Sequence, residues 1–194
     1  MTARSTNLGS QPMRTTIETA EILTPIGRVI LVAHQGRLCG VGLGREPEWV
    51  RHVTERRFGE IEWVAGDDPA GAASALERYF SGELQAPDSI PVDPGGTPFQ
   101  RRVWSALRDI PVGQTCSYSY VARTIGAPKA LRAVGAANGA NPVGIVIPCH
   151  RVVGVGGDLV GYGGGLDLKR WLLVHEGVRL PPERPHQKRL GFLA

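Results

Sequence analysis

A cysteine and a histidine stand side by side in residues 143–151, which read Val-Gly-Ile-Val-Ile-Pro-Cys-His-Arg. The β-branched run at 145–147 predicts a short buried strand, and Pro148 ends that strand because proline fixes φ and lacks a backbone donor. Cys149 and His150 would therefore lie at the exit of a strand, where the backbone is rigid. We expect the thiol to be fixed in place and still reachable from a cleft.

A thiol at such a position can act as a nucleophile. Only the thiolate is reactive, and a basic imidazole beside Cys149 lowers the thiol pKa from roughly 8.5 toward neutrality. An inert cysteine of the hydrophobic core is the alternative, because free cysteines are commonly buried as small apolar residues. Residues 143–151 by themselves leave both hypotheses open.

A carboxylate further along the chain is a candidate partner for the imidazole. We expect a helix capped by Asp167, in which Leu168, Leu172 and Glu176 follow at intervals of four residues. This spacing puts Glu176 on the apolar, inward face, and a buried carboxylate needs a partner. With His150 as that partner, the carboxylate orients the imidazole and the imidazole activates the thiol. The alternative is that Glu176, near the helix end, turns to solvent.

The stretch between the thiol and this helix is rich in glycine. Residues 152–165 contain seven glycines, with Tyr162 among them. Such a composition predicts a loop, and its glycines let the backbone approach a ligand closely. A flexible linker is the alternative interpretation.

Two helices upstream of the thiol are predicted to form a helix-turn-helix. Ser117 can cap a short helix that extends to Ile125, and residues 126–128 break it. A longer helix is expected at 129–139. Two helices joined by a short turn that contains glycine match the helix-turn-helix pattern.

The second of these helices has two unlike faces. The side expected to face the core carries Ala130, Leu131, Val134 and Ala137. The opposite side carries Arg132, Gly135, Ala136 and Gly139. A face of small residues with a single arginine can approach something narrow, such as the minor groove of DNA, because no bulky side chain holds it out. Packing against the first domain is the alternative, since small residues help there too.

The first half of the chain predicts a small antiparallel sheet with helices. Strands are expected at 16–23, 28–34, 37–43 and 61–64, and helices at 46–58 and 68–80. The first three strands are separated by Pro/Gly turns and form a meander, with Cys39 as a core residue. Residues 85–96 hold three prolines, cannot be helical and are the best domain boundary. Beyond them, Thr97, Pro98 and Gln100 supply the N-cap, N1 proline and capping-box partner of a helix.

The composition excludes several classes of protein. Of the 194 residues, 21% are charged and 42% hydrophobic, as in ordinary globular proteins. The net charge of +4 and the pI near 9.2 fit a polyanionic partner without requiring one. We find no apolar run of the ~18 residues that a membrane span needs and no secretory signal. Three widely spaced cysteines favour a reducing compartment, so we expect a cytoplasmic protein without metal or cofactor.

Taken together, these motifs resemble those of the O6-alkylguanine-DNA alkyltransferases, also called methylated-DNA–protein-cysteine methyltransferases. The resemblance rests on Ile-Pro-Cys-His-Arg-Val at 147–152, with Asn141-Pro142 before it and Gly161-Tyr162 and His175-Glu176-Gly177 after it. It extends through Phe99-Gln100, Ser117-Tyr118, Pro128-Lys129-Ala130 and Arg132-Ala133-Val134-Gly135. It covers most of residues 97–177 and is looser over the first ninety residues.

The resemblance implies a fold and a division into segments. The implied fold class is α+β, with a small RNase H-like N-terminal antiparallel sheet with helices, followed by a mostly helical winged-helix/helix-turn-helix domain. The implied segments are a disordered leader at 1–14, a supporting α/β domain at 15–90, the alkyltransferase domain at 91–180 and a tail at 181–194.

The resemblance also implies an activity, the direct reversal of DNA damage. Such proteins bind double-stranded DNA through the minor groove, rotate the damaged guanine out of the stack and move its O6-alkyl group onto their own cysteine. For this chain it implies irreversible, single-turnover transfer from O6-alkylguanine, and also from O4-alkylthymine, to Cys149. The implied partner is duplex DNA that carries the lesion, without membrane, metal or cofactor. The protein is expected to be a monomer, with clustering on DNA left open, associated with the nucleoid if the source is bacterial.

Matched positions carry the family's roles to individual residues. His150, through a water, and Glu176 generate the thiolate of Cys149. Asn141 ties the helix-turn-helix to the active-site segment, and Tyr118 donates to the departing guanine.

DNA contacts and the base pocket are implied in the same way. Arg132 takes the place of the extruded base in the stack. The implied DNA-binding residues are Arg132, Ala133, Gly135, Ala136 and Gly139. The implied base pocket consists of Tyr118, Val152, Tyr162, Gly163 and Gly164. Gly144 stands where some members have proline and Gly163 where some have serine, which leaves open the alkyl groups that are accepted.

Two other functions compete with this one on the residues alone. A thiol hydrolase or protease would use the cysteine, histidine and glutamate for acyl transfer with turnover. A module that recognises alkylated DNA without repairing it would need no cysteine, so Cys149 disfavours it.

Overall fold

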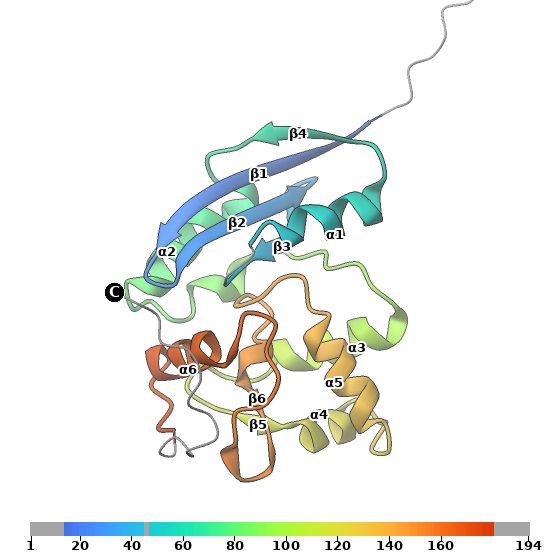
Figure 1. The fold of residues 1–194 in the computed structure, drawn as a ribbon, viewed down its shortest axis with the longest axis vertical. Coiled ribbons are helices and arrows are strands. Elements are labelled where there is room, and N and C mark those ends of the chain that lie inside the picture. The colour runs from blue at the N-terminus through green and yellow to red at the C-terminus, as the bar shows by residue number, and fades with distance from the viewer. Residues whose placement is uncertain (1–13, 45–46, 181–194) are drawn as a thin grey trace, which may run out of the picture.

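The computed structural model describes residues 14–44 and 47–180. The predicted tail at 181–194 and all but the last residue of the predicted leader at 1–14 lie outside the described residues. The sheet and its two helices form one end of the molecule, and the later helices form the other (Figure 1). This arrangement agrees with the predicted α+β class.

The sheet has four strands: β1 (Thr15–Thr24), β2 (Gly27–His34), β3 (Arg37–Gly42) and β4 (Ile61–Ala65). Their order is β3-β2-β1-β4, and the first three strands form the predicted antiparallel meander. The fourth pairs with β1 in parallel, so the sheet is mixed and not wholly antiparallel. The physical reason is the connection: α1 (Trp49–Phe58) carries the chain back across the sheet, as parallel pairing requires.

Both faces of β2 are buried, with alternate residues in different clusters. Val29 and Leu31 point toward the second half of the molecule, whereas Ile30 and Val32 pack with Val50 of α1. This alternation is the period of two expected of a strand. The sheet is therefore covered on both sides.

The second predicted helix begins later than the sequence indicated. α2 spans Ala72–Phe80 and follows a 3₁₀ turn, η1 (Pro69–Gly71). Ala70 and Gly71 have φ values of 57° and 70°, which lie outside the helical region. The carboxylate of Asp68 instead accepts from the backbone N–H of Ala73, 2.7 Å away, and so satisfies the start of the helix.

The proline-rich connection is not free of helical structure. Residues Ala86–Ser89 form a 3₁₀ turn, η2, because proline is tolerated in a first helical turn. Further on, the connection runs along the edge strand β3: the N–H of Leu38 donates to Pro91 O at 2.8 Å and the N–H of Asp93 donates to Leu38 O at 2.9 Å. The chain thereby covers an edge that would otherwise present unpaired groups.

The second half of the described chain is mainly helical. Its elements are α3 (Pro98–Arg108), β5 (Cys116–Ser117), α4 (Tyr118–Thr124), α5 (Leu131–Gly139), η3 (Cys149–Arg151), β6 (Val152–Val153), η4 (Val155–Gly157) and α6 (Leu166–His175). The capping box of Thr97 and Gln100 and the N-cap of Ser117 are confirmed. α5 begins two residues later than predicted. α6 is capped by Gly165, so Asp167 lies in its first turn and the predicted cap is wrong.

The predicted strand at 145–147 is also wrong, although the run is buried as expected. The chain makes a bridge between Val143 and Val41 of β3 and then turns, with Ile145 at φ 70°. The N–H of Val146 donates to Gly144 O and that of Ile147 to Val143 O, both at 2.9 Å. β-branched residues indicated burial correctly, but local turns and not a strand ladder satisfy their backbone.

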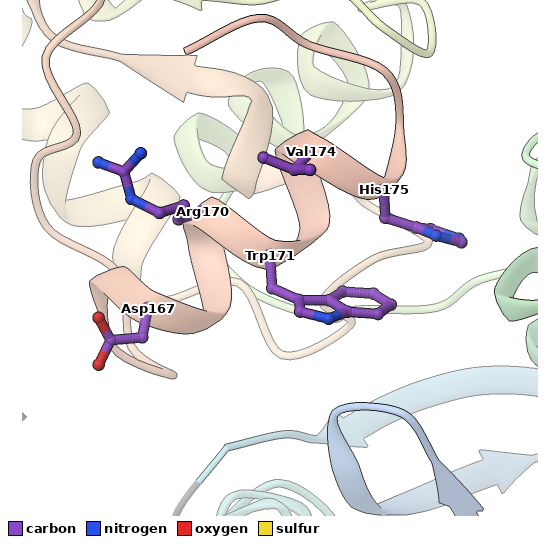
Figure 2. A pocket seen from close by; sticks show the side chains of 5 residues that line it. All are labelled: Asp167, Arg170, Trp171, Val174 and His175. Carbon is purple, nitrogen blue, oxygen red and sulfur yellow. The ribbon is translucent and has the colours of Figure 1, made fainter. Parts of the chain in front are cut away.

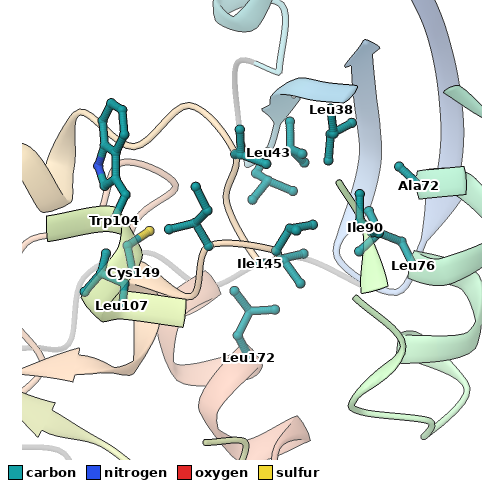
Figure 3. Packing of buried hydrophobic residues seen from close by; sticks show 14 of the residues in the cluster. Leu38, Leu43, Ala72, Leu76, Ile90, Trp104, Leu107, Ile145, Cys149 and Leu172 are labelled. Carbon is teal, nitrogen blue, oxygen red and sulfur yellow. The ribbon is translucent and has the colours of Figure 1, made fainter. Parts of the chain in front are cut away.

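One hydrophobic core passes between the two halves (Figure 3). It joins Leu38 of β3 and Leu76 of α2 to Leu107 of α3, Ile145 and Leu172 of α6. The predicted domain limits at 90 and 180 remain predictions. No helix within residues 14–44 and 47–180 is long and apolar enough to span a membrane.

Candidate active site

Cys149 opens the 3₁₀ turn η3 and lies in the core that joins the two halves (Figure 3). Its own N–H donates to Ile147 O at 2.8 Å, which fixes the backbone. The residue is only 6% exposed. The thiol is thus held in place as predicted, but it is far less accessible than expected because Trp104 and Leu107 of α3 belong to the same packed cluster.

Two asparagines connect the thiol segment to the end of α5. The amide of Asn141 donates to Ile147 O at 2.8 Å, and its oxygen accepts from the N–H of Val143 at 3.0 Å. The amide of Asn138 donates to Cys149 O at 3.4 Å. Asn138, within α5, therefore ties that helix to the thiol segment, a link that the sequence did not indicate. Asn141 lies two residues beyond α5 and holds the thiol segment at Val143 and Ile147, and its predicted role stays a prediction.

His150 and Glu176 meet in the interior. The Nε2 of His150 lies 2.9 Å from Oε1 of Glu176, and both side chains are fully buried. The predicted contact is present, and the alternative in which Glu176 turns to solvent is wrong. Leu168 and Leu172 are buried on the same side of α6, so the spacing of four residues was the correct signal.

The tautomer of His150 follows from its partner. Hydrogen bonds from His150 and Arg151 hold the pKa of Glu176 at about 2, although burial alone would raise it. An ionised carboxylate only accepts, so Nε2 of His150 carries the proton. Within the described part of the chain, Nδ1 of His150 has no hydrogen-bond partner. Its lone pair is available to act as a base.

Two further residues complete the surroundings of Glu176, and neither was predicted. The guanidinium of Arg151 donates from Nε to Oε2 at 2.8 Å and from Nη2 to Oε1 at 2.9 Å, and its Nη1 donates to Ile110 O at 2.6 Å. The hydroxyl of Tyr79, from α2, donates to Oε1 at 3.0 Å. The signal for Arg151 was present, because a charge within an apolar run must find a partner.

Burial is the largest influence on the pKa values of both His150 and Cys149. It lowers the pKa of His150 below the ordinary 6.5, although Glu176 acts in the opposite direction. It also raises the pKa of the Cys149 thiol, and the Asn141 amide and the Lys169 charge oppose this only partly. The predicted lowering of the thiol pKa is therefore wrong for the free protein. The resting state is a thiol beside a neutral imidazole.

Lys169 is a buried cation that the sequence did not single out. Its Nζ donates to Val152 O at 2.6 Å and to Val160 O at 2.8 Å, which ties α6 to the glycine-rich segment. Burial lowers its pKa to about 8, while the charge of Cys149 raises it. Lys169 therefore lies close enough to the sulfur to interact with it electrostatically.

The predicted pocket residues differ in their surroundings, and their role stays a prediction. Val152 is buried in β6. Burial and then the charge of Cys149 raise the pKa values of both Tyr118 and Tyr162. At Gly164 a Cβ would come within 2.6 Å of Leu168 and 3.2 Å of Tyr162, whereas at Gly163 it would meet no atom within 4 Å. Gly164 thus allows Tyr162 to pack closely.

The face of α5 that was assigned to DNA is exposed. Arg132, Ala133, Ala136 and Gly139 are exposed and Gly135 is partly exposed. On the opposite side Val134 and Ala137 are buried as predicted, and Ala137 O accepts from the indole of Trp104 at 2.8 Å. Leu131 was placed in the core, but it is 46% exposed because it is the first residue of the helix.

A pocket of about 470 Å³ is lined by residues of α6 and not by Cys149 (Figure 2). Its lining residues are Asp167, Arg170, Trp171, Val174 and His175. Among residues 14–44 and 47–180, no cluster of His, Cys, Asp or Glu side chains is arranged to hold a metal ion.

Comparison with known proteins places this geometry in a family. The family model described as "6-O-methylguanine DNA methyltransferase, DNA binding domain" matches residues 98–178. A Salmonella typhimurium protein named methylated-DNA–protein-cysteine methyltransferase is 54% identical over 164 residues, which are 82% of this chain and 95% of that protein.

Solved structures agree. The Mycobacterium tuberculosis O6-methylguanine methyltransferase superposes with a TM-score of 0.68 at 40% identity, over 86% of this chain and 96% of that one. The Mycobacterium tuberculosis protein OGT, solved in complex with DNA, superposes with a TM-score of 0.67 at 42% identity, over 83% of this chain and 92% of that one. The family model, the close relatives and the shared fold together show that this chain belongs to the methylated-DNA–protein-cysteine methyltransferase family.

Proposed function

We propose that this protein transfers the alkyl group of O6-alkylguanine in duplex DNA to Sγ of Cys149. The observation that carries the proposal is the buried His150–Glu176 pair, which leaves Nδ1 of the imidazole without a hydrogen-bond partner in the residue that follows the buried Cys149. O4-alkylthymine presents a similar alkyl–oxygen bond next to a ring nitrogen, so it is the second expected substrate.

The chemistry needs a base because the resting thiol is protonated. Nδ1 of His150, through a water as the family resemblance implies, takes the thiol proton, and Glu176 stabilises the imidazolium that forms. The thiolate attacks the alkyl carbon, so the S–C bond forms as the C–O6 bond breaks. The electron pair stays on the guanine, and the hydroxyl of Tyr118 stabilises it by donating a hydrogen bond. The proton that His150 took from the thiol is the one that the guanine finally gains, so the protein ends with a thioether and a neutral imidazole.

The reaction is a single event for each protein molecule. The product is a thioether, which is not a leaving group under these conditions. Cys149 therefore stays alkylated. The guanine leaves unmodified and the DNA is repaired without a strand break.

Access to the sulfur requires the damaged base to leave the helical stack, because a buried thiol cannot enter a duplex. The exposed face of α5 lies against the minor groove, where Ala133, Gly135, Ala136 and Gly139 keep the helix axis close to the DNA. Arg132, the charged residue of that face, occupies the space that the base vacates.

The extruded base rests against the glycine-rich segment. Tyr118, Val152 and Tyr162 form its walls, and Gly163 and Gly164 let the backbone approach it closely. Only the alkyl carbon has to touch the sulfur. The small exposed fraction of Cys149 is consistent with that, because the glycine-rich segment makes room for the rest of the base.

Intact-mass measurement tests the proposal directly. After exposure to a duplex containing O6-methylguanine, the protein should gain the mass of one methyl group. Cys149→Ser should abolish the gain while duplex binding persists. Cys39→Ser is the matched control, because Cys39 is equally buried but its thiol donates to Val32 O in an apolar cluster. Burial raises the pKa of Cys39 to about 11, so this thiol stays inert. Methyl transfer by Cys149→Ser would refute the proposal.

A further inference from the structure

Tyr79 reaches the active site from the other half of the molecule. It lies in the last turn of α2, is fully buried and is separated from Glu176 by 97 positions in the sequence. Its hydroxyl nevertheless donates to Oε1 of Glu176 at 3.0 Å. The segment matched by the family's DNA-binding-domain model begins at residue 98, so this hydrogen bond comes from outside it.

The position of Tyr79 is fixed at its backbone and at its ring. Its carbonyl accepts from Nε2 of His175 at 2.9 Å, and its ring meets the His175 ring edge-on at 4.9 Å. His175 in turn stacks on Trp171 at 4.9 Å with an interplanar angle of 19°. Figure 2 shows Trp171 and His175 side by side on α6. The phenol is thus held by the residue that precedes the carboxylate it contacts.

The hydroxyl bonds to the same oxygen that serves the imidazole. Oε1 of Glu176 accepts from Nε2 of His150 and from Nη2 of Arg151, each at 2.9 Å, and from Tyr79. Oε2 accepts from Nε of Arg151. Arg151 therefore fixes the plane of the carboxylate, while Tyr79 adds a neutral donor at the oxygen that orients the imidazole.

We propose that Tyr79 is a positioning residue for alkyl transfer: its hydroxyl holds Oε1 of Glu176 where it orients the imidazole of His150. This inference rests on the proposed function, in which His150 is the base for Cys149. The N-terminal half thereby contributes to alkyl transfer, because the carboxylate of Glu176 receives the hydrogen bond from Tyr79 only when α2 packs against the second half.

Removing the hydroxyl has a predictable electrostatic effect. A hydrogen bond to an ionised carboxylate favours the charged form, so without it the pKa of Glu176 rises and the carboxylate attracts the His150 proton more strongly. As a result of both changes, the His150–Glu176 pair keeps an additional proton up to a higher pH. Among the described residues, the other titratable groups whose charges act on the pair are Arg151 from η3, Lys169 from α6 and Tyr162 from the glycine-rich segment. Cys149 precedes His150 in the chain, and His175 of α6 contacts Tyr79.

The test compares Tyr79→Phe with the wild type in the full chain. The rate of alkyl gain is measured by intact mass over a range of pH, with free O6-benzylguanine and with duplex O6-methylguanine. We expect both rates to fall by about tenfold, as for other partners that orient a catalytic group. We also expect the acid limb of the rate–pH profile to move to higher pH, which a purely structural role would not produce.

Thr54→Val is the matched control. The Thr54 hydroxyl is also buried in the N-terminal half, but it donates to Val50 O at 2.7 Å within α1. Its loss should leave the rates and the acid limb unchanged. Unchanged rates and an unchanged limb in a folded Tyr79→Phe variant would overturn the inference.

A second replacement keeps the test decisive if Tyr79→Phe does not fold. A ring-fluorinated tyrosine at position 79 keeps the shape of the side chain and is a stronger donor. It should move the acid limb to lower pH, and no movement would overturn the inference. If the wild type itself gained no alkyl group, the proposed function would fail. If the wild type reacted and the Tyr79 variant reacted at the same rate and pH, only the inference about Tyr79 would fail.

Discussion

The surroundings of Glu176 and the outer face of α5 are built in opposite ways. Around the carboxylate, the side chains of Tyr79, His150 and Arg151 are buried and meet it through hydrogen bonds of 2.8–3.0 Å. The outer face of α5 carries small residues and the exposed Arg132. In the proposed function, alkyl transfer depends on the side chains that surround Glu176, whereas DNA binding depends on the absence of bulky side chains from the outer face of α5.

This contrast predicts two kinds of variant. Changes around the carboxylate should affect folding and the reaction with every substrate, because a buried polar group without its partner costs free energy. Changes on the face of α5 should leave folding and small-molecule reactions intact and should affect only the reaction with duplex DNA.

Glu176→Gln should give the largest effect. It leaves the guanidinium of Arg151 buried without an anionic partner, which should lower the free energy of unfolding by about 3–5 kcal/mol. The rate of alkyl gain should fall on the order of a hundredfold with both free benzylguanine and duplex substrate, because the imidazolium loses its counter-charge. Denaturant unfolding and intact-mass kinetics measure the two effects.

The same variant should change the acid dependence of stability. The pKa of Glu176 is about 2 in the folded protein against 4.5 for an ordinary glutamate, so its contribution is present above pH 4.5 and lost as pH falls through 2. This shift is worth about 3 kcal/mol. Burial also lowers the pKa of His150 below 6.5, so the folded state loses further stability as pH falls below that value, where the unfolded chain takes up the proton more readily. Glu176→Gln should flatten the curve between pH 4.5 and 2.

An exposed ion pair provides the control for these measurements. Glu83 pairs with Arg78 at 2.8 Å with both side chains more than half exposed. Glu83→Gln should change the free energy of unfolding by no more than about 1 kcal/mol and should leave the rate unaltered. If Glu83→Gln and Glu176→Gln lost the same free energy of unfolding and the same rate, the burial of Glu176 would not explain the effect of its replacement.

Arg132→Ala should have an intermediate effect that depends on the substrate. With duplex O6-methylguanine the rate should fall on the order of tenfold, because the vacancy in the stack is no longer filled. With free benzylguanine it should be unchanged, because no stack has to be opened. Arg56→Ala, which removes an exposed arginine of α1, should leave both rates as they are. Equal losses on both substrates would indicate a folding defect instead.

Ala136→Leu should give the smallest effect. The added bulk would hold α5 out of the minor groove, so affinity for duplex DNA should fall several-fold while the free energy of unfolding changes by less than about 0.5 kcal/mol. Ala136→Ser is the matched control, because it adds a single atom and should retain affinity. Binding can be followed by fluorescence anisotropy, and unchanged affinity in the leucine variant would place the DNA on another surface.

Patterns that depend on neighbouring residues were predicted well. The capping box at Thr97, the N-cap at Ser117 and the inward position of Glu176 all follow from local geometry, and all are present. The strand predicted at 145–147 failed because a buried backbone can satisfy its hydrogen bonds in turns as well as in a ladder. The cap predicted at Asp167 failed because α6 begins at Leu166, so Asp167 already lies in its first turn.

By itself, the sequence determined the chemical groups and their order: a thiol next to an imidazole, a carboxylate on the apolar side of a helix, and a second helix with a face of small residues. Tertiary structure alone decided that Tyr79 and Arg151 meet that carboxylate and that the thiol rests protonated. The physical reason is that burial and long-range contacts set hydrogen bonding and pKa, and neither is a property of residues close together in the chain.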